Sequence, residues 1–151
     1  TVGADGRPPL PPTMRILAID PGEKHIGVAV SDPSGTVARP LITLAHTSRD
    51  EDAARIAGLA QAHSAEMILI GLALDAEDKR GPQARRAERL AEAVRRLTPL
   101  PVQLHDESFS SQSAQPSLIA VGRQRRARRE QVHAVAAAAI LQSYLDGHAP
   151  E

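Results

Sequence analysis

The sequence feature that most constrains the fold is a pair of short apolar runs joined by an acidic turn. Residues 15–20 read RILAID, Pro21 and Gly22 follow, and a second apolar run occupies residues 26–30. An apolar run that ends in a carboxylate and returns after a Pro-Gly turn predicts a β-hairpin. The first strand of this hairpin then carries Asp20 at its C-terminal tip.

The second strand of the hairpin has two unlike faces. Because side chains alternate along a strand, Ile26, Val28 and Val30 share one face, and the small residues between them, including Gly27, share the other. Small side chains allow another segment to approach the backbone closely. The face that holds Gly27 therefore permits something bulky to approach the strand closely.

The remaining elements alternate between strands and helices. Apolar periodicity predicts strands at residues 36–44, 67–71 and 102–105, and helices at 50–62, 81–97 and 130–146. Pro40 cannot donate to a sheet ladder, so its strand should be an edge strand or contain a bulge. Right-handed crossovers make the strands beginning at Arg15, Met67 and Val102 parallel neighbours, which predicts an α/β fold.

Composition excludes several classes of protein. The 151 residues contain no cysteine, which excludes disulfides and thiolate metal sites and fits a cytoplasmic protein. No apolar run approaches the roughly 20 residues that span a bilayer, so no membrane association is expected. The net charge is zero, so binding of nucleic acid requires local basic patches. Residues 1–13 contain four prolines and no apolar periodicity, which indicates a disordered leader or tag remnant, and residues 148–151 form a tail.

Acidic residues follow two of the expected parallel strands. Asp20 ends the first strand and Glu107 comes shortly after the strand at 102–105. The carboxyl ends of parallel strands share one edge of a sheet, where such folds place ligands. Two carboxylates there suit Mg²⁺ or Mn²⁺, and His133 near the start of the last helix offers a third ligand. Spacing alone leaves open that each acid is a cap or turn residue.

Four blocks of the sequence resemble the YqgF family, also called RuvX. This is a family of Holliday junction resolvases and pre-16S rRNA nucleases with a ribonuclease-H-like (RNase H-like) fold. The blocks are residues 20–32, residues 70–74 with Gly81-Pro82, residues 105–107 and residues 136–145. They follow the family's order and cover nearly the whole chain, although Ala73 replaces the usual proline. The resemblance implies one RNase H-like domain over residues 14–147, with a mixed five-stranded sheet flanked by helices.

The resemblance also implies roles for the three candidate ligands. Asp20 and Glu107 fall on the first two catalytic acids of the family, and His133 falls on the third, which is usually aspartate. It implies an endonuclease that uses Mg²⁺ or Mn²⁺ to hydrolyse phosphodiester bonds in branched DNA or precursor rRNA. A neutral imidazole ligand would shift the preference toward Mn²⁺. The alternative is a helix-surface histidine in an impaired, nucleic-acid-binding module, and Ser108 also replaces the family's arginine. Symmetric cutting of a four-way junction would require a homodimer.

Basic residues gather in two places that suit backbone phosphate. One group surrounds the start of the helix at 81–97, where the helix N-terminus itself favours anions, and a second directly precedes the last helix. Lys24 in the first turn is a further candidate. For the group before the last helix the alternative is a solvated loop, and for Lys24 it is a solvated turn lysine. The residues of the two groups are Lys79, Arg80, Arg85 and Arg86, and Arg123, Arg125, Arg126, Arg128 and Arg129.

Overall fold

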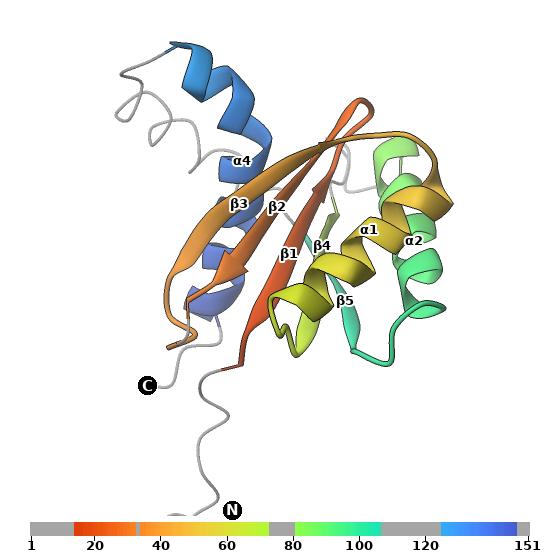
Figure 1. The fold of residues 1–151 in the computed structure, drawn as a ribbon, viewed down its shortest axis with the longest axis horizontal. Helices are drawn as coiled ribbons and strands as arrows, with labels where there is room; N and C mark the ends of the chain where they lie inside the picture. Colours follow the sequence, from red (N-terminus) through yellow and green to blue (C-terminus); the bar gives the residue numbers. More distant parts are fainter. Residues whose placement is uncertain (1–13, 33, 73–80, 107–124, 148–151) are drawn as a thin grey trace, which may run out of the picture.

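The protein folds around one five-stranded sheet (Figure 1). A computed structural model describes residues 14–32, 34–72, 81–106 and 125–147, the last range without the side chains of residues 125–131. The strand order is β3-β2-β1-β4-β5, with β2 antiparallel to β1 and β3, and β4 and β5 parallel to β1. The strands are β1 (Ile16–Pro21), β2 (His25–Ser31), β3 (Ala38–Ala45), β4 (Met67–Leu72) and β5 (Val102–Asp106).

The central strands β1 and β4 are apolar because both of their faces are covered. In β1, Leu17 and Ile19 enter one core and Ala18 enters the other, and all three are fully buried. β3 is an edge strand, and its register with β2 shifts between Val28 and Ala29, opposite the Pro40 region. The predicted parallel strands, and both consequences of the proline, are therefore confirmed.

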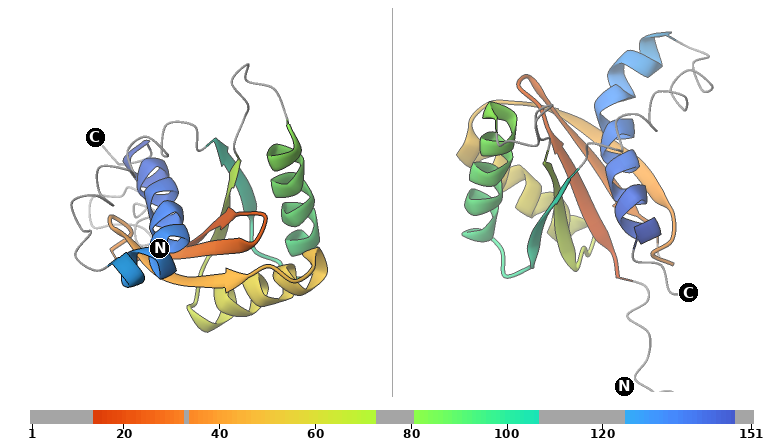
Figure 2. Two further views of the ribbon diagram at one scale, coloured as in Figure 1. Left: turned by 90° about the horizontal axis from the view of Figure 1, so that it is seen from above. Right: turned by 180° about the vertical axis from the view of Figure 1, so that it is seen from behind.

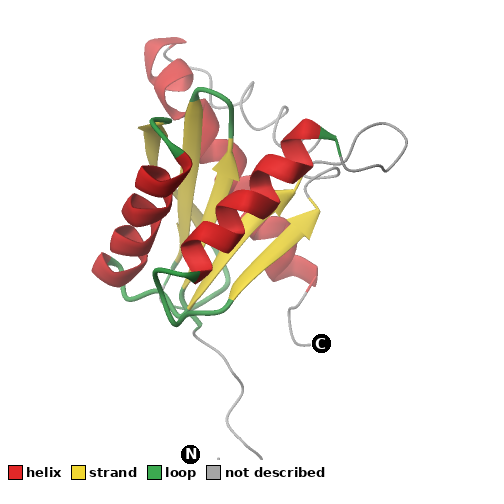
Figure 3. Ribbon diagram, turned by 90° about the vertical axis from the view of Figure 1, so that its right-hand side faces the viewer, coloured by secondary structure: helices red, strands yellow, loops and turns green. Residues whose placement is uncertain are grey.

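Helices cover the two faces of the sheet unequally (Figures 2 and 3). Helices α1 (Arg49–Ala62) and α2 (Pro82–Arg95) pack together on one face, and α4 (Arg125–Gly147) crosses the other. In α1 the hydroxyl of Ser48 accepts a hydrogen bond from the Glu51 amide at 3.2 Å, a typical N-cap. Pro82 opens α2, where the missing N–H costs nothing. Within the described ranges, none of these helices is long and apolar enough to cross a membrane.

Helix α4 begins earlier than the sequence pattern predicts. The last helix was expected from residue 130 with the arginines in a loop before it, but α4 starts at Arg125. Arginine is a good helix former, and residues 125–146 contain no glycine or proline, so nothing stops the helix from extending toward its N-terminus. Four arginines of the second basic group, Arg125, Arg126, Arg128 and Arg129, therefore belong to the first turns of α4.

Candidate functional site

Asp20 lies at the C-terminal end of β1, on the face of the sheet that α4 covers. Alternation places Asp20 on the same side as Ala18, which packs in the core beneath α4. Across the antiparallel ladder Asp20 pairs with Gly27 of β2. The Asp20 residue is half-buried. The hairpin thus presents a carboxylate beside the helix that carries His133.

Helix α4 approaches the sheet most closely at Gly27. A Cβ atom at this position would overlap the carbonyl group of His133 and would lie 3.0 Å from the Ala134 nitrogen. Only glycine allows the two backbones to come this close. Helix α4 thus makes the close approach that the small residues of this face permit, and it brings His133 next to the strand residue that pairs with Asp20.

A second imidazole accompanies His133. The rings of His25 and His133 are stacked, with centroids 5.0 Å apart and planes 20° from parallel. His25 begins β2 and lies two residues before Gly27, so it belongs to the same face of the strand. The sequence interpretation did not include His25. The signal that would have found it is this alternation, because His25 shares the face of small residues that permits a close approach.

The remaining predicted ligand, Glu107, lies outside the described residues. β5 ends at Asp106, which pairs with Leu72 of β4, so the C-terminal ends of β1, β4 and β5 share one edge of the sheet. His105 packs edge-on against Tyr144 of α4, with ring centroids 5.6 Å apart. Over the described part of the chain, no three His, Asp or Glu side chains group closely enough to hold a metal ion. The set Asp20, Glu107 and His133 therefore stays a prediction, with donor chemistry that suits Mg²⁺ or Mn²⁺.

The structure describes only some of the predicted phosphate-binding residues. Lys79, Arg80 and Arg123 lie outside the described residues, and the side chains of the four arginines in α4 are not described. Lys24 is exposed in the turn between β1 and β2. Arg85 and Arg86 line a pocket of about 390 Å³ beside the same turn. This pocket lies on the α1–α2 side of the sheet, since its wall includes Ile26, which belongs to the core beneath α1 and α2.

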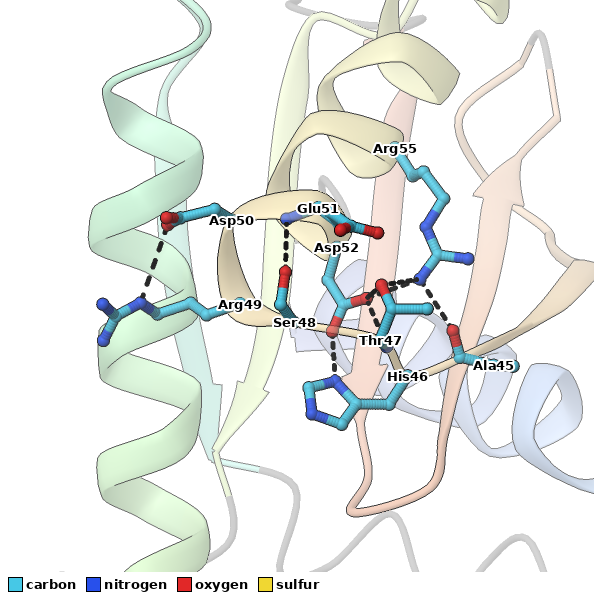
Figure 4. A network of polar contacts seen from close by, with 9 residues as sticks. All are labelled: Ala45, His46, Thr47, Ser48, Arg49, Asp50, Glu51, Asp52 and Arg55. Atoms are coloured by element: carbon cyan, nitrogen blue, oxygen red, sulfur yellow. Dashed lines mark hydrogen bonds and ion pairs between the residues drawn. The ribbon is translucent and has the colours of Figure 1, made fainter.

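A buried carboxylate borders this pocket, and Figure 4 shows its polar contacts. The side chain of Asp52 in α1 is 2% exposed and accepts hydrogen bonds from His46 Nδ1, from the Thr47 amide at 3.2 Å and from Arg55 Nη2 at 2.5 Å. Burial opposes ionisation, but these donors outweigh it and hold the pKa of Asp52 below its ordinary value of 3.8.

We expect Asp52→Ala to lower the free energy of unfolding by about 2 kcal/mol at pH 7, because it removes charge-assisted hydrogen bonds that join the loop after β3 to α1. The folded-state pKa lies below the unfolded one, so this contribution is complete above the unfolded value of 3.8 and is lost as the pH falls through the folded value. Urea denaturation of the wild type and the Asp52→Ala variant, at pH 7 and in acid, tests this expectation. A difference in stability that stays constant or grows on acidification contradicts it.

Solved structures with this architecture define the class of fold. The chain superposes on Thermus thermophilus RuvC, determined with a Holliday junction substrate, with a TM-score of 0.56 and 18% identity over 89% of this chain and 94% of that one. The fowlpox virus resolvase gives a TM-score of 0.56 at 11% identity, over 91% of this chain and 100% of its own. The protein therefore has the RNase H-like fold of RuvC-like resolvases, as the resemblance implied.

Sequence comparison gives the family. Residues 14–147 match the family model described as RuvX, Holliday junction resolvase. A protein of Syntrophomonas wolfei named "Putative pre-16S rRNA nuclease" is 37% identical over 134 residues, which cover 89% of this chain and 95% of that protein. A protein of the same name from Anaeromyxobacter dehalogenans is 39% identical, over 91% of this chain and 100% of its own. The chain belongs to the RuvX family of Holliday junction resolvases.

Proposed function

We propose that this protein is a divalent-metal-dependent endonuclease that hydrolyses phosphodiester bonds in structured nucleic acid. Its substrates are Holliday junctions, the 5′ end of pre-16S rRNA, or both. The observation that carries this proposal is the position of Asp20, at the C-terminal end of β1 and paired with Gly27, against which the backbone of His133 packs. Membership of the RuvX family supports the proposal.

In this proposal Asp20, Glu107 and His133 hold Mg²⁺ or Mn²⁺. When bound, such an ion lowers the pKa of a water molecule and stabilises the negative charge that develops at the phosphate. Asp20 and His133 are held in place by the hairpin and by α4, so they orient the site before substrate arrives. Symmetric cutting of a four-way junction calls for a homodimer, and we place the protein in the cytoplasm.

Backbone phosphate is bound in this proposal by the basic residues on both sides of the hairpin. Such contacts are independent of sequence and set the affinity and register of the nucleic acid. Near-absence of aromatic residues, 1% of the chain, leaves little means of stacking on bases, so recognition depends on shape and charge. The proposed residues are Lys24, Lys79, Arg80, Arg85, Arg86, Arg123, Arg125, Arg126, Arg128 and Arg129.

A second candidate is a nucleic-acid-binding module of the same fold with an impaired site. The stacking of His133 on His25 favours it, because the contact gives His133 a packing role that needs no metal. Cleavage of a synthetic four-way DNA junction, a matching duplex and a precursor-rRNA fragment, each with Mg²⁺, Mn²⁺ or chelator, separates the two. Metal-dependent cutting supports the nuclease, and the preferred substrate distinguishes recombination from rRNA maturation. Binding without cutting under either metal overturns the nuclease proposal.

The role of His133 is tested by restoring the family's aspartate. If imidazole is the working ligand, we expect His133→Asp to lower Mn²⁺-supported cleavage by about tenfold or more, because geometry and donor type change together. The activity ratio between Mn²⁺ and Mg²⁺ should move toward Mg²⁺. Initial rates in both metals measure this. A large rise in cleavage shows instead that the site has decayed from an aspartate-containing ancestor.

A further inference from the structure

The pocket beside the β1–β2 turn, here called the turn pocket, is strongly basic. It has a volume of about 390 Å³, and its wall contains Pro21 and Gly22 at the turn, His46 from the loop between β3 and α1, Arg49 at the start of α1, and Arg85 and Arg89 from α2. Arg86 also lines it. Against these cations, the only carboxylate among the described residues of the wall is Asp52. A concave surface with this excess of positive charge selects anions.

The arginines of α2 are arranged in a way that an isolated helix disfavours. Arg85 and Arg89 are one turn apart on the same helix, and like charges at this spacing repel. No carboxylate of the described chain forms an ion pair with either, and Arg86 has only Glu23, 71% exposed, at 3.7 Å. Among the residues that the structure describes, Arg49 forms an ion pair with the exposed Asp50, at 3.9 Å. An anion bound between these guanidinium groups would remove the repulsion.

His46 adds an oriented hydrogen-bonding group to the wall. Its Nδ1 is bonded to Asp52, which is itself fixed by Arg55 and by the Thr47 amide. The backbone amide of His46 donates to the carbonyl oxygen of Lys24 at 2.9 Å and ties it to the hairpin turn. Nε2 lies on the side of the ring away from Asp52 (Figure 4). A carboxylate that is hydrogen-bonded to one nitrogen of an imidazole ring holds the ring so that the other nitrogen is presented to a ligand.

The turn pocket and the proposed cleavage site lie on opposite sides of the hairpin. Pro21, directly after Asp20, lines the pocket, whereas Asp20 belongs to the face that α4 covers. A phosphate in the pocket is therefore a different phosphate from the one beside Asp20. Guanidinium groups and an imidazole bind phosphate oxygens with directed, charge-assisted hydrogen bonds.

We propose that the turn pocket binds a backbone phosphate of the nucleic-acid substrate that is not the one cut, so that the hairpin tip lies between two segments of substrate backbone. This inference rests on the proposed nuclease function and names a substrate class, nucleic acid with two backbone segments diverging at the hairpin. A four-way junction presents such segments at its branch point, whereas a plain duplex presents them only across its grooves.

The test measures binding without cleavage, in chelator, for a four-way junction and a matching duplex. Arg85→Gln/Arg89→Gln is compared with Arg39→Gln/Arg96→Gln, which removes the same charge from exposed positions outside the pocket. We expect the pocket variant to bind the junction about tenfold more weakly at moderate salt, and the control about twofold or less. The slope of log affinity against log salt should fall by about 1 to 2 in the pocket variant alone. His46→Gln should weaken junction binding without changing this slope.

Each outcome of this test has a defined meaning. Equal weakening by the pocket and control variants overturns the proposal, and so does equal weakening for junction and duplex. A third outcome is that inorganic phosphate or a mononucleotide binds saturably, that this binding depends on Arg85 and Arg89, and that junction binding is unchanged in the pocket variant. This outcome identifies a small-molecule site and also overturns the proposal. Because no step requires cleavage, failure of the nuclease proposal would appear separately, as absence of cutting by the wild-type protein.

Discussion

Replacing Asp20 by asparagine is expected to lower metal-dependent cleavage at least about 1,000-fold. The substitution keeps the size of the side chain and removes its negative charge. Asp20 is half-buried at the end of β1 rather than within the core, so the fold should survive the change. The proposed divalent ion, in contrast, would lose one of few carboxylate ligands, and the charge of a ligand set dominates its affinity for a hard cation.

The matched control for this variant is Asp146→Asn at the opposite end of α4 from His133. Asp146 accepts a hydrogen bond from Gln142 at 3.0 Å, which asparagine can retain, and it lies far along the helix from the hairpin. We expect Asp146→Asn to cut at the wild-type rate and Asp20→Asn to bind junction DNA normally in chelator. Cleavage by Asp20→Asn within tenfold of wild type would show that the carboxylate has no part in the chemistry.

Gly27→Ala should be the most destabilising single-methyl change in the described sheet. The added Cβ would overlap the carbonyl group of His133, and both neighbours are backbone that cannot rotate aside. Either α4 moves away from β2 or the strand bends, and we expect a loss of at least about 3 kcal/mol in the free energy of unfolding. Urea denaturation followed by circular dichroism measures this loss.

Gly58→Ala provides the control for the glycine substitution. Gly58 lies within α1, and nothing stands within 4 Å of a Cβ added there. Alanine should therefore stabilise the protein by about 0.5 to 1 kcal/mol through helix propensity alone. If Gly27→Ala lowers the free energy of unfolding by less than about 1 kcal/mol, α4 does not pack on β2 as described. His133 is then not held beside the strand residue that pairs with Asp20.

The hairpin and the effect of Pro40 could be predicted from the sequence because each pattern is local. Ile26, Val28 and Val30 alternate with small residues, and this period requires only one strand. Pro40 predicted an edge or a bulge for the same reason, since the missing N–H acts at its own position. These predictions needed no knowledge of which segment packs on which.

The features that escaped prediction depend on contacts and helix boundaries that apolar periodicity does not report. Asp52 is buried because His46 and Arg55 reach it from both sides of the α1 N-terminus, whereas periodicity treats any aspartate as a surface residue. The stacking of His25 on His133 needs the contact of α4 with β2. The start of α4 was misplaced because an arginine run suits a helix as well as a solvated loop.

The central claim, that Asp20 holds a divalent ion beside α4, is tested most directly by Mn²⁺-induced line broadening in the NMR spectrum of the ¹⁵N-labelled protein. At substoichiometric Mn²⁺ the account predicts selective broadening of the amide signals of Asp20, Gly27 and His133, abolished in Asp20→Asn and retained in Asp146→Asn. Broadening centred instead on Asp50 and Glu51, the acidic first turn of α1, and unaffected by Asp20→Asn would contradict it.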